Sequence, residues 1–240
     1  MKIIISALLW AAGLIHGVLA FVVAITALAI FPPKKAYPLL QWLAKTQLAV
    51  MGVRLKVEGQ KKIDPDKSWF LMGNHESLFD VFIIPATVPF FFVGVEAASH
   101  FSWPIWGYLI KKWGNIPIPR YKKTQAFSAL KKAKEILDSG ASLIILPEGH
   151  RTLTGEVGEF KKGPFHLALT AKADILPFAM SGAYQYKNKH SWMLTPGEIT
   201  VRFGDPIPHE SFNKMSVEAL GDHVRHRIMR LKRAGEKPLH

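Results

Sequence analysis

The fold is indicated most clearly by residues 69–80, which read WFLMGNHESLFD. The first four are apolar and form a short run typical of a buried strand, and Gly73 with the polar residues after it ends that run in a turn. From Phe79 the chain becomes apolar again, at a spacing that suits a short helix over residues 79–87. A strand that ends in a polar turn and leads into a helix is the building unit of an α/β sheet, and ligands bind at such strand ends.

The same alternation continues on both sides of this unit. Further apolar runs of strand length lie at residues 55–57, 90–95, 143–146, 175–180 and 199–203. Helical patterns lie between them at residues 104–113 and 124–139, and Gly140 ends the second. Its apolar face consists of Phe127, Leu130, Ala133, Ile136 and Leu137. We therefore expect an α/β fold with a mostly parallel, twisted sheet flanked by helices.

The N-terminal segment has a different composition. Residues 3–33 contain no Asp, Glu, Lys or Arg, and only Ser6, His16 and Thr26 interrupt the apolar run over residues 3–31. About 29 helical residues would reach roughly 43 Å, more than the ~30 Å hydrocarbon core of a bilayer. We expect residues 1–53 to form membrane-anchoring helices and residues 54–240 to form the main domain.

Two details of this anchor stay open. A second apolar-rich stretch over residues 37–53 makes a helical hairpin in one leaflet as good a fit as a single span. The tripeptide Ala27-Leu28-Ala29 imitates a signal-peptide cleavage site, but the apolar run is far longer than the ~7–15 residues of a signal sequence, which favours a retained anchor. The cations that follow it, Lys34, Lys35, Lys45 and Arg54, predict a membrane protein whose main domain faces the cytoplasm.

Composition narrows the range of functions. The 240 residues include 31 Lys+Arg and 18 Asp+Glu, a formal charge of +13, and 49% are hydrophobic. Such a basic chain suits a nucleic acid, an anionic membrane or a phosphorylated small molecule. With no cysteine, disulfides, iron–sulfur clusters, thiolate zinc sites and a cysteine nucleophile are excluded.

His75 and Asp80 are the candidate catalytic pair. Five positions apart on one ideal helix, they would be separated by roughly 140° and could not meet. They can meet if His75 lies in the turn and Asp80 in the first turn of the following helix. The carboxylate would then set the imidazole tautomer and leave the other ring nitrogen to take a proton. A surface histidine with ordinary partners is the alternative.

Three other stretches carry surplus polar chemistry next to apolar runs. Residues 114–120 (GNIPIPR) end in Arg120, residues 147–152 (PEGHRT) follow a predicted strand, and residues 160–164 (FKKGP) can open a helix with unpaired N–H groups. Residues 175–179 form an apolar strand that contains Pro177. Cations at strand ends beside a helix start suit a phosphate, although solvated surface is the simpler interpretation of each.

These stretches, in this order, resemble the four motifs of the glycerolipid acyltransferases, specifically the 1-acyl-sn-glycerol-3-phosphate (lysophosphatidic acid) acyltransferase family. The matching residues are Asn74, His75 and Asp80, then residues 114–120, then Glu148, Gly149 and Arg151, and last Leu176 and Pro177. An N-terminal membrane helix pair is also similar to the family.

The resemblance implies a role for each matching residue. His75 would be the general base and Asp80 its orienting partner, so that the acceptor hydroxyl attacks the acyl thioester of acyl-CoA or acyl carrier protein directly. No cofactor or metal is implied beyond this donor. Arg120 would bind the acceptor phosphate and Pro177 would shape the acyl-donor side, whereas further substrate contacts are expected from Asn74, Glu148, Gly149 and Arg151. Lys161 and Lys162 would add charge near the acceptor phosphate or the pantetheine phosphates.

Two departures from the family pattern affect the acceptor. His150 occupies a place where the family usually has Thr, and Pro117 stands near the place of a bulky aromatic residue. The expected product is phosphatidic acid, made from lysophosphatidic acid in phospholipid biosynthesis. Acylation of another lyso-lipid, such as lyso-ornithine lipid or a lysophospholipid with a larger headgroup, stays open.

The C-terminal residues 214–233 combine the helically spaced Leu220, Val224, Ile228 and Leu231 with Arg225, Arg227, Arg230, Lys232 and Arg233 around them, so this helix could rest on anionic lipid or pack on the domain. His223 and His226 lack a third metal ligand nearby. A non-catalytic, lipid-binding membrane adaptor is the alternative from another class. A nucleic-acid binder would explain the charge but neither the apolar segment nor the motifs, so we expect no nucleic-acid partner.

Overall fold

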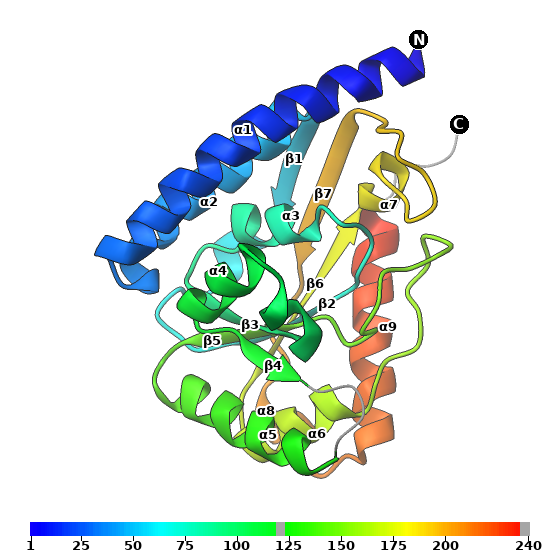
Figure 1. Ribbon diagram of the computed structural model, residues 1–240. Helices are drawn as coiled ribbons and strands as arrows, with labels where there is room; N and C mark the ends of the chain where they lie inside the picture. The colour runs from blue at the N-terminus through cyan, green and yellow to red at the C-terminus, as the bar shows by residue number, and fades with distance from the viewer. Residues whose placement is uncertain (119–122, 236–240) are drawn as a thin grey trace.

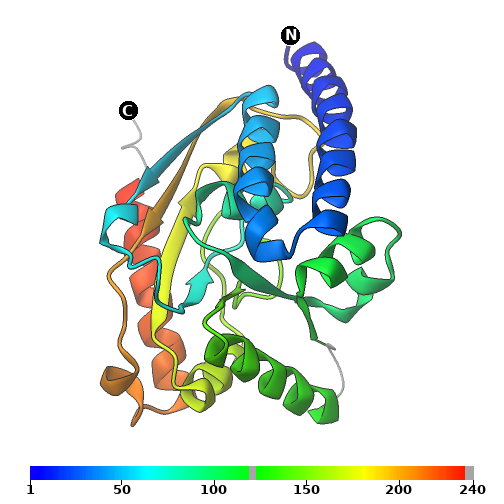
Figure 2. The same ribbon diagram turned by 90° about the vertical axis from the view of Figure 1, so that its left-hand side faces the viewer.

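A computed structural model describes the backbone of residues 1–118 and 123–235 and the side chains of residues 1–118 and 131–234. In this part of the chain a twisted sheet lies at the centre and helices cover both of its faces (Figure 1). Figure 2 shows the two N-terminal helices lying side by side along one face, with the C-terminal helix on the opposite face.

The strands of the described chain are β1 (Val53–Glu58), β2 (Phe70–Gly73), β3 (Phe92–Ala97), β4 (Ile116–Ile118), β5 (Ser142–Ile145), β6 (Ile175–Ser181) and β7 (Gly197–Phe203). The helices are α1 (Lys2–Ile30), α2 (Pro33–Val50), α3 (Asp80–Thr87), α4 (Trp106–Trp113), α5 (Lys123–Asp138), α6 (Gly163–Ala171), α7 (Ala183–Tyr186), α8 (His209–Phe212) and α9 (Val217–Gly235), with short 3-10 helices η1 (Gln60–Lys62) and η2 (Ala98–Ser102).

The described strands form one sheet in the order β1-β7-β6-β2-β5-β3-β4. The neighbours from β6 to β4 are all parallel, whereas β7 runs antiparallel to β6 and β1 runs parallel to β7. The predicted α/β fold with a mostly parallel sheet is confirmed. Five strands therefore point their carboxyl ends toward the same edge, where the parallel arrangement collects the loops that follow them.

β4 is the element that sequence analysis did not identify as a strand. Its three residues, Ile116-Pro117-Ile118, pair only with β3 at the edge of the sheet. A proline is tolerated there because an edge strand leaves one row of N–H groups without a ladder partner. The six predicted strands are all present, with each end within two residues of the one expected.

Two apolar cores form on the two faces of the sheet because side chains alternate along a strand. In β2, Leu71 packs in the core beneath α2 and α3, whereas Phe70 and Met72 pack in the core on the face of α5, α6 and α9. The apolar face of α9 joins this second core through Leu220, Val224 and Ile228, all fully buried. The C-terminal helix is therefore a packing element of the domain, with Arg227, Arg230 and Arg233 exposed on its outer side.

The N-terminal helices pack closely against each other and against the domain. A Cβ atom at Gly13 would lie 2.5 Å from Met51 Sδ, so only glycine allows this approach. Nε2 of Gln47 in α2 donates to the Gly13 carbonyl (2.9 Å). Oε1 of the same side chain lies 2.7 Å from Nδ1 of His16, a polar residue within the apolar helix α1. Because Leu48 and Met51 are also buried in the core beneath α3, the division at residue 53 stays a prediction.

By length and composition α1 is the helix of the described chain that could cross a membrane, with 22% of its most apolar window buried. Ser6 both donates to and accepts from the backbone of Leu194 (3.4 and 3.0 Å), and Trp10 Nε1 donates to the carbonyl of Trp192 (2.7 Å). These contacts attach α1 to the loop that follows α7.

We expect Gly73→Ala to destabilise the protein by about 1–3 kcal/mol, the usual cost of overpacking a core. A Cβ at Gly73 would lie 2.3 Å from the ring of Phe178, which is buried in the first core and has no room to move. Thermal unfolding in detergent, followed by circular dichroism, would show a lower Tm. The matched control is Gly163→Ala, because a Cβ there meets no atom within 4 Å; equal shifts in the two variants would contradict the packing argument.

Candidate functional site

The candidate site lies where β2, β5 and β6, adjacent in the sheet, end at the same edge. The loops that follow these strands are tied together by backbone bonds. The Thr152 N–H donates to the His75 carbonyl (2.8 Å), and the Ser77 hydroxyl donates to the Lys187 carbonyl (2.8 Å). Residues more than a hundred positions apart thus meet around the turn after β2.

His75 and Asp80 form the pair that their spacing allows. Nδ1 of His75 lies 2.6 Å from Oδ2 of Asp80, with His75 in the turn and Asp80 as the first residue of α3. The carboxylate can only accept, so Nδ1 carries the hydrogen and Nε2 is the nitrogen that can take a proton. The Asp80 side chain is 2% exposed and that of His75 is 25% exposed, so the imidazole alone can reach a substrate.

Backbone N–H groups of the turn donate to the Asp80 carboxylate. The N–H of Glu76 donates to Oδ2 (2.9 Å), and the N–H of Ser77 lies 3.2 Å from both oxygens. These N–H groups fix the orientation of the carboxylate, so Oδ2 of Asp80 is held toward the imidazole of His75.

Glu148 supports the same turn from β5. Its Oε1 accepts from the N–H of His75 (2.7 Å) and its Oε2 accepts from the N–H of Gly158 (2.9 Å). Burial raises the pKa of Glu148, and these two N–H groups oppose that rise. The side chain is 1% exposed, so its described contacts place the backbone of the candidate base, and the predicted substrate contact stays a prediction.

Asn74 has a similar structural surrounding. Its side chain is buried, donates to the carbonyl of Met180 (2.9 Å) and accepts from the N–H of the same residue (2.7 Å). This pair of bonds joins the end of β2 to the end of β6. A direct substrate contact of Asn74 is not among its described bonds and also stays a prediction.

The other predicted residues are spread over the site and beyond it. Gly149 and His150 are exposed in the loop after β5, Arg151 beside them is half-buried, and Lys161 is exposed while its N–H donates to the Pro147 carbonyl (2.8 Å). Lys162 points elsewhere, because its ammonium pairs with Glu218 of α9 (2.6 Å).

One predicted residue, Pro177, is not part of this cluster. Pro177 is buried within β6, opposite Met72 in the register, four residues before the end of the strand. Its position in the sheet interior does not by itself reveal a surface for the acyl donor. Arg120 lies outside the described residues, so its expected contact with a phosphate stays a prediction.

The structure adds three residues that sequence analysis did not select. Lys187, after α7, is 9% exposed, and burial together with the nearby charge of Arg151 lowers its pKa. Glu76, the residue after His75, forms a buried ion pair with Lys232, with 2.6 Å between Oε1 and Nζ. A signal for Lys232 was present, since it continues the four-residue spacing of Leu220, Val224 and Ile228 on the buried face of α9. Lys187 lies in an irregular loop, where no periodic pattern marks it.

Within the described residues, no group of three or more His, Asp or Glu side chains is placed to hold a metal ion. His223 is instead surrounded by cations, and burial with the charges of Arg227 and His226 lowers its pKa.

The chain is similar in sequence to known acyltransferases. Residues 54–181 match the family described as Acyltransferase. The chain is 30% identical over 179 residues to human 1-acyl-sn-glycerol-3-phosphate acyltransferase alpha, covering 74% of this chain and 63% of that protein. It is 29% identical over 194 residues to the 1-acyl-sn-glycerol-3-phosphate acyltransferase of Limnanthes douglasii, covering 79% of this chain and 67% of that protein.

A solved structure extends the likeness to the whole fold. The crystal structure of the 1-acyl-sn-glycerophosphate (LPA) acyltransferase PlsC from Thermotoga maritima superposes with a TM-score of 0.84 over 100% of both chains, at 22% sequence identity. At that identity the match concerns the fold. The matched segment contains His75, Asp80 and Glu148, whose contacts are described above, and it covers more than half of the sequence; the chain belongs to the Acyltransferase family.

Proposed function

We propose that this protein transfers a fatty acyl chain from acyl-CoA or acyl carrier protein to the free hydroxyl of lysophosphatidic acid, giving phosphatidic acid. The observation that carries the proposal is the His75–Asp80 pair, 2.6 Å apart, at the carboxyl edge of the sheet in a member of the Acyltransferase family. The names of the relatives support the choice of acceptor.

The reaction proceeds by direct attack. Nε2 of His75 takes the proton of the acceptor hydroxyl while the hydroxyl oxygen forms a bond to the thioester carbonyl carbon. The carbon–sulfur bond then breaks, and the thiolate recovers the proton from the imidazolium. Asp80 stabilises the imidazolium between the two steps. No acyl-enzyme is needed: the chain has no cysteine, and the buried Ser77 hydroxyl donates to a carbonyl rather than to the imidazole. The proposal includes no metal and no cofactor beyond the donor.

Cations from two loops suit the phosphate of the acceptor. Arg151 follows β5 and Lys187 follows β6, and their mutual repulsion contributes to the lowered pKa of Lys187. A phosphate would neutralise both and gain charge-assisted hydrogen bonds. We assign the acceptor phosphate to this pair together with Arg120, and further acceptor contacts to Gly149 and His150. Because His150 is exposed at this place, it is the residue that would adapt the site to another lyso-lipid headgroup.

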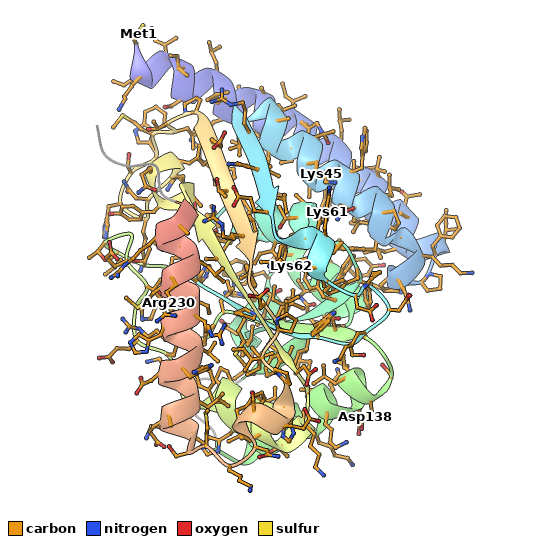
Figure 3. The ribbon with its side chains drawn as sticks, turned by 180° about the vertical axis from the view of Figure 1, so that it is seen from behind. Met1, Lys45, Lys61, Lys62, Asp138 and Arg230 are labelled. Carbon is orange, nitrogen blue, oxygen red and sulfur yellow. The ribbon has the colours of Figure 1, made fainter. Side chains whose placement is uncertain are left out.

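The apolar helix α1 and the cations near it suit a membrane-bound enzyme. Many apolar residues of α1 are exposed, including Ile4, Leu8 and Leu14 at 65–68%. Figure 3 labels Lys45 of α2 and Lys61 and Lys62 of η1 on one face of the molecule. We propose that α1 lies in the membrane and that the catalytic domain faces the cytoplasm, where these cations would meet anionic headgroups.

His75→Ala is expected to lower acyl transfer by about 10²–10⁴-fold, the usual contribution of a general base. The measurement is conversion of lysophosphatidic acid to phosphatidic acid by the nanodisc-held protein, with labelled acyl-CoA and labelled acyl carrier protein supplied separately. His166→Ala, an exposed histidine on α6, is the matched control and should retain activity.

Each other outcome changes a different part of the proposal. Near wild-type transfer by His75→Ala would reject the mechanism. Product from another lyso-lipid but not from lysophosphatidic acid would keep the mechanism and change the acceptor. Acceptor binding without turnover under all conditions would identify a lipid-binding membrane adaptor.

Arg151→Ala and Lys187→Met should each raise the KM for lysophosphatidic acid about ten-fold or more, because each removes a charge-assisted contact to the phosphate. The kcat should change less, since neither side chain touches the His75–Asp80 pair in the described contacts. Steady-state kinetics at varied acceptor concentration measures both. Lys189→Met, an exposed lysine on the same loop as Lys187, is the control; an unchanged KM in both test variants would remove them from the phosphate site.

A further inference from the structure

A second buried ion pair lies directly behind the candidate base. The carboxylate of Glu76 is 1% exposed and the side chain of Lys232 is 4% exposed, with Nζ 2.6 Å from Oε1. Oε1 also accepts from the side-chain amide of Asn74 (3.2 Å), and Oε2 accepts from the N–H of Tyr184 (3.0 Å). Glu76 thus connects the turn after β2 with α7 and with α9.

Lys232 is itself held in place at the backbone. Its carbonyl accepts from the hydroxyl of Ser181 at the end of β6 (3.0 Å), and the neighbouring carbonyl of Leu231 accepts from Arg202 of β7 (2.9 Å). The last turn of α9 is therefore fixed to two strands. We call residues 74–79, between β2 and α3, the catalytic turn. Because Lys232 lies on a fixed helix turn, its ammonium has a defined place next to the catalytic turn.

The backbone of Glu76 connects this ion pair to the dyad formed by His75 and Asp80. The same residue whose side chain is bound by Lys232 donates its N–H to Oδ2 of Asp80, the oxygen that lies 2.6 Å from His75. A shift of Glu76 would therefore move the support of Asp80 and with it the imidazole. Near-attack geometry tolerates little displacement, because about 1 Å can cost roughly 10²-fold in rate.

We propose that Glu76 and Lys232 are positioning residues that hold the His75–Asp80 dyad in its reactive geometry, so that the C-terminal helix takes part in catalysis through the catalytic turn. This inference rests on the proposed function, in which His75 is the base. The pair touches neither the acceptor nor the donor in this assignment, and its effect falls on kcat rather than on binding.

The electrostatics of the pair give the proposal a pH signature. Burial raises the pKa of Glu76 to about 7, with a further rise from the Asp80 charge, while the Lys232 ammonium and the Tyr184 N–H oppose it. Without Lys232, the opposing charge is lost and the carboxyl would bind its proton more tightly. At a pH below this raised pKa Glu76 is neutral and its burial costs little, whereas at higher pH an unpaired anion is buried beside Asp80.

The test compares Lys232→Met, the double variant Glu76→Gln/Lys232→Met and the wild type in nanodiscs at about pH 6 and about pH 9.5. The higher value is set well above the pKa of Glu76 in the wild type, because removal of Lys232 raises that pKa further. At the higher pH, Lys232→Met should lower kcat roughly 10- to 100-fold while the KM for both substrates changes less than about two-fold. The deficit relative to wild type should shrink at the lower pH. The double variant carries no buried charge, so its deficit should be smaller at high pH and equal at both values.

Arg230→Met is the matched control, since Arg230 is an exposed cation on the same helix (Figure 3). It should keep wild-type kcat at both pH values. A Lys232→Met enzyme with wild-type kcat, or with a deficit that is the same at both pH values, would overturn the inference. If Lys232→Met does not fold, the double variant alone decides, because a wild-type kcat in that folded variant would also overturn it. A wild-type enzyme without activity would instead reject the proposed function.

Discussion

The hydrogen bond between His75 Nδ1 and Asp80 Oδ2, 2.6 Å long, is the interaction on which the rest of the site depends. Two residues five positions apart cannot meet on one helix, so the chain must turn between them and α3 must begin at Asp80. The turn is possible because β2 ends at Gly73, and the N–H groups of Glu76 and Ser77 then point at the carboxylate. The dyad and the start of the helix form together.

Three carboxylates are buried around this turn, at 1% exposure each: Glu76, Asp80 and Glu148. An uncompensated buried charge costs several kcal/mol, so each must be matched by donors or by a cation. Asp80 and Glu148 are matched by backbone N–H groups, and Glu76 by Lys232 with further donors. The apolar cores on the two faces of the sheet provide the stability that offsets the cost of burying these charges. Active sites commonly depart from the best local packing in this way.

The N-terminal helices bring the proposed membrane anchor into contact with the same region. The Trp10 ring lies 5.9 Å from the ring of Phe79, the residue just before Asp80, and Trp10 also donates to the loop after α7. In the proposed reaction a lipid acceptor and a water-soluble donor must meet at an interface. If α1 lies in the membrane as proposed, its contact with Phe79 would give that interface a defined position relative to His75.

Much of this protein follows from its sequence alone. Apolar runs of strand length, separated by helical patterns, determined the α/β class because burial on both faces of a parallel sheet requires them. The spacing of His75 and Asp80 determined that they could meet only across a turn, and the uncharged run over residues 3–33 determined an apolar N-terminal helix. These are local properties, set by periodicity and by backbone geometry.

The tertiary structure decided what depends on contacts between distant segments. Glu148 and Asn74 found backbone partners on other strands and loops. Lys162 paired with Glu218, and Lys232 paired with Glu76 across 156 positions. The tertiary structure also turned the apolar face of the C-terminal helix into the domain core. A charged residue carries no mark in the sequence of whether its partner is water, a substrate or a buried counter-ion, because that choice is made only when the strands and helices pack.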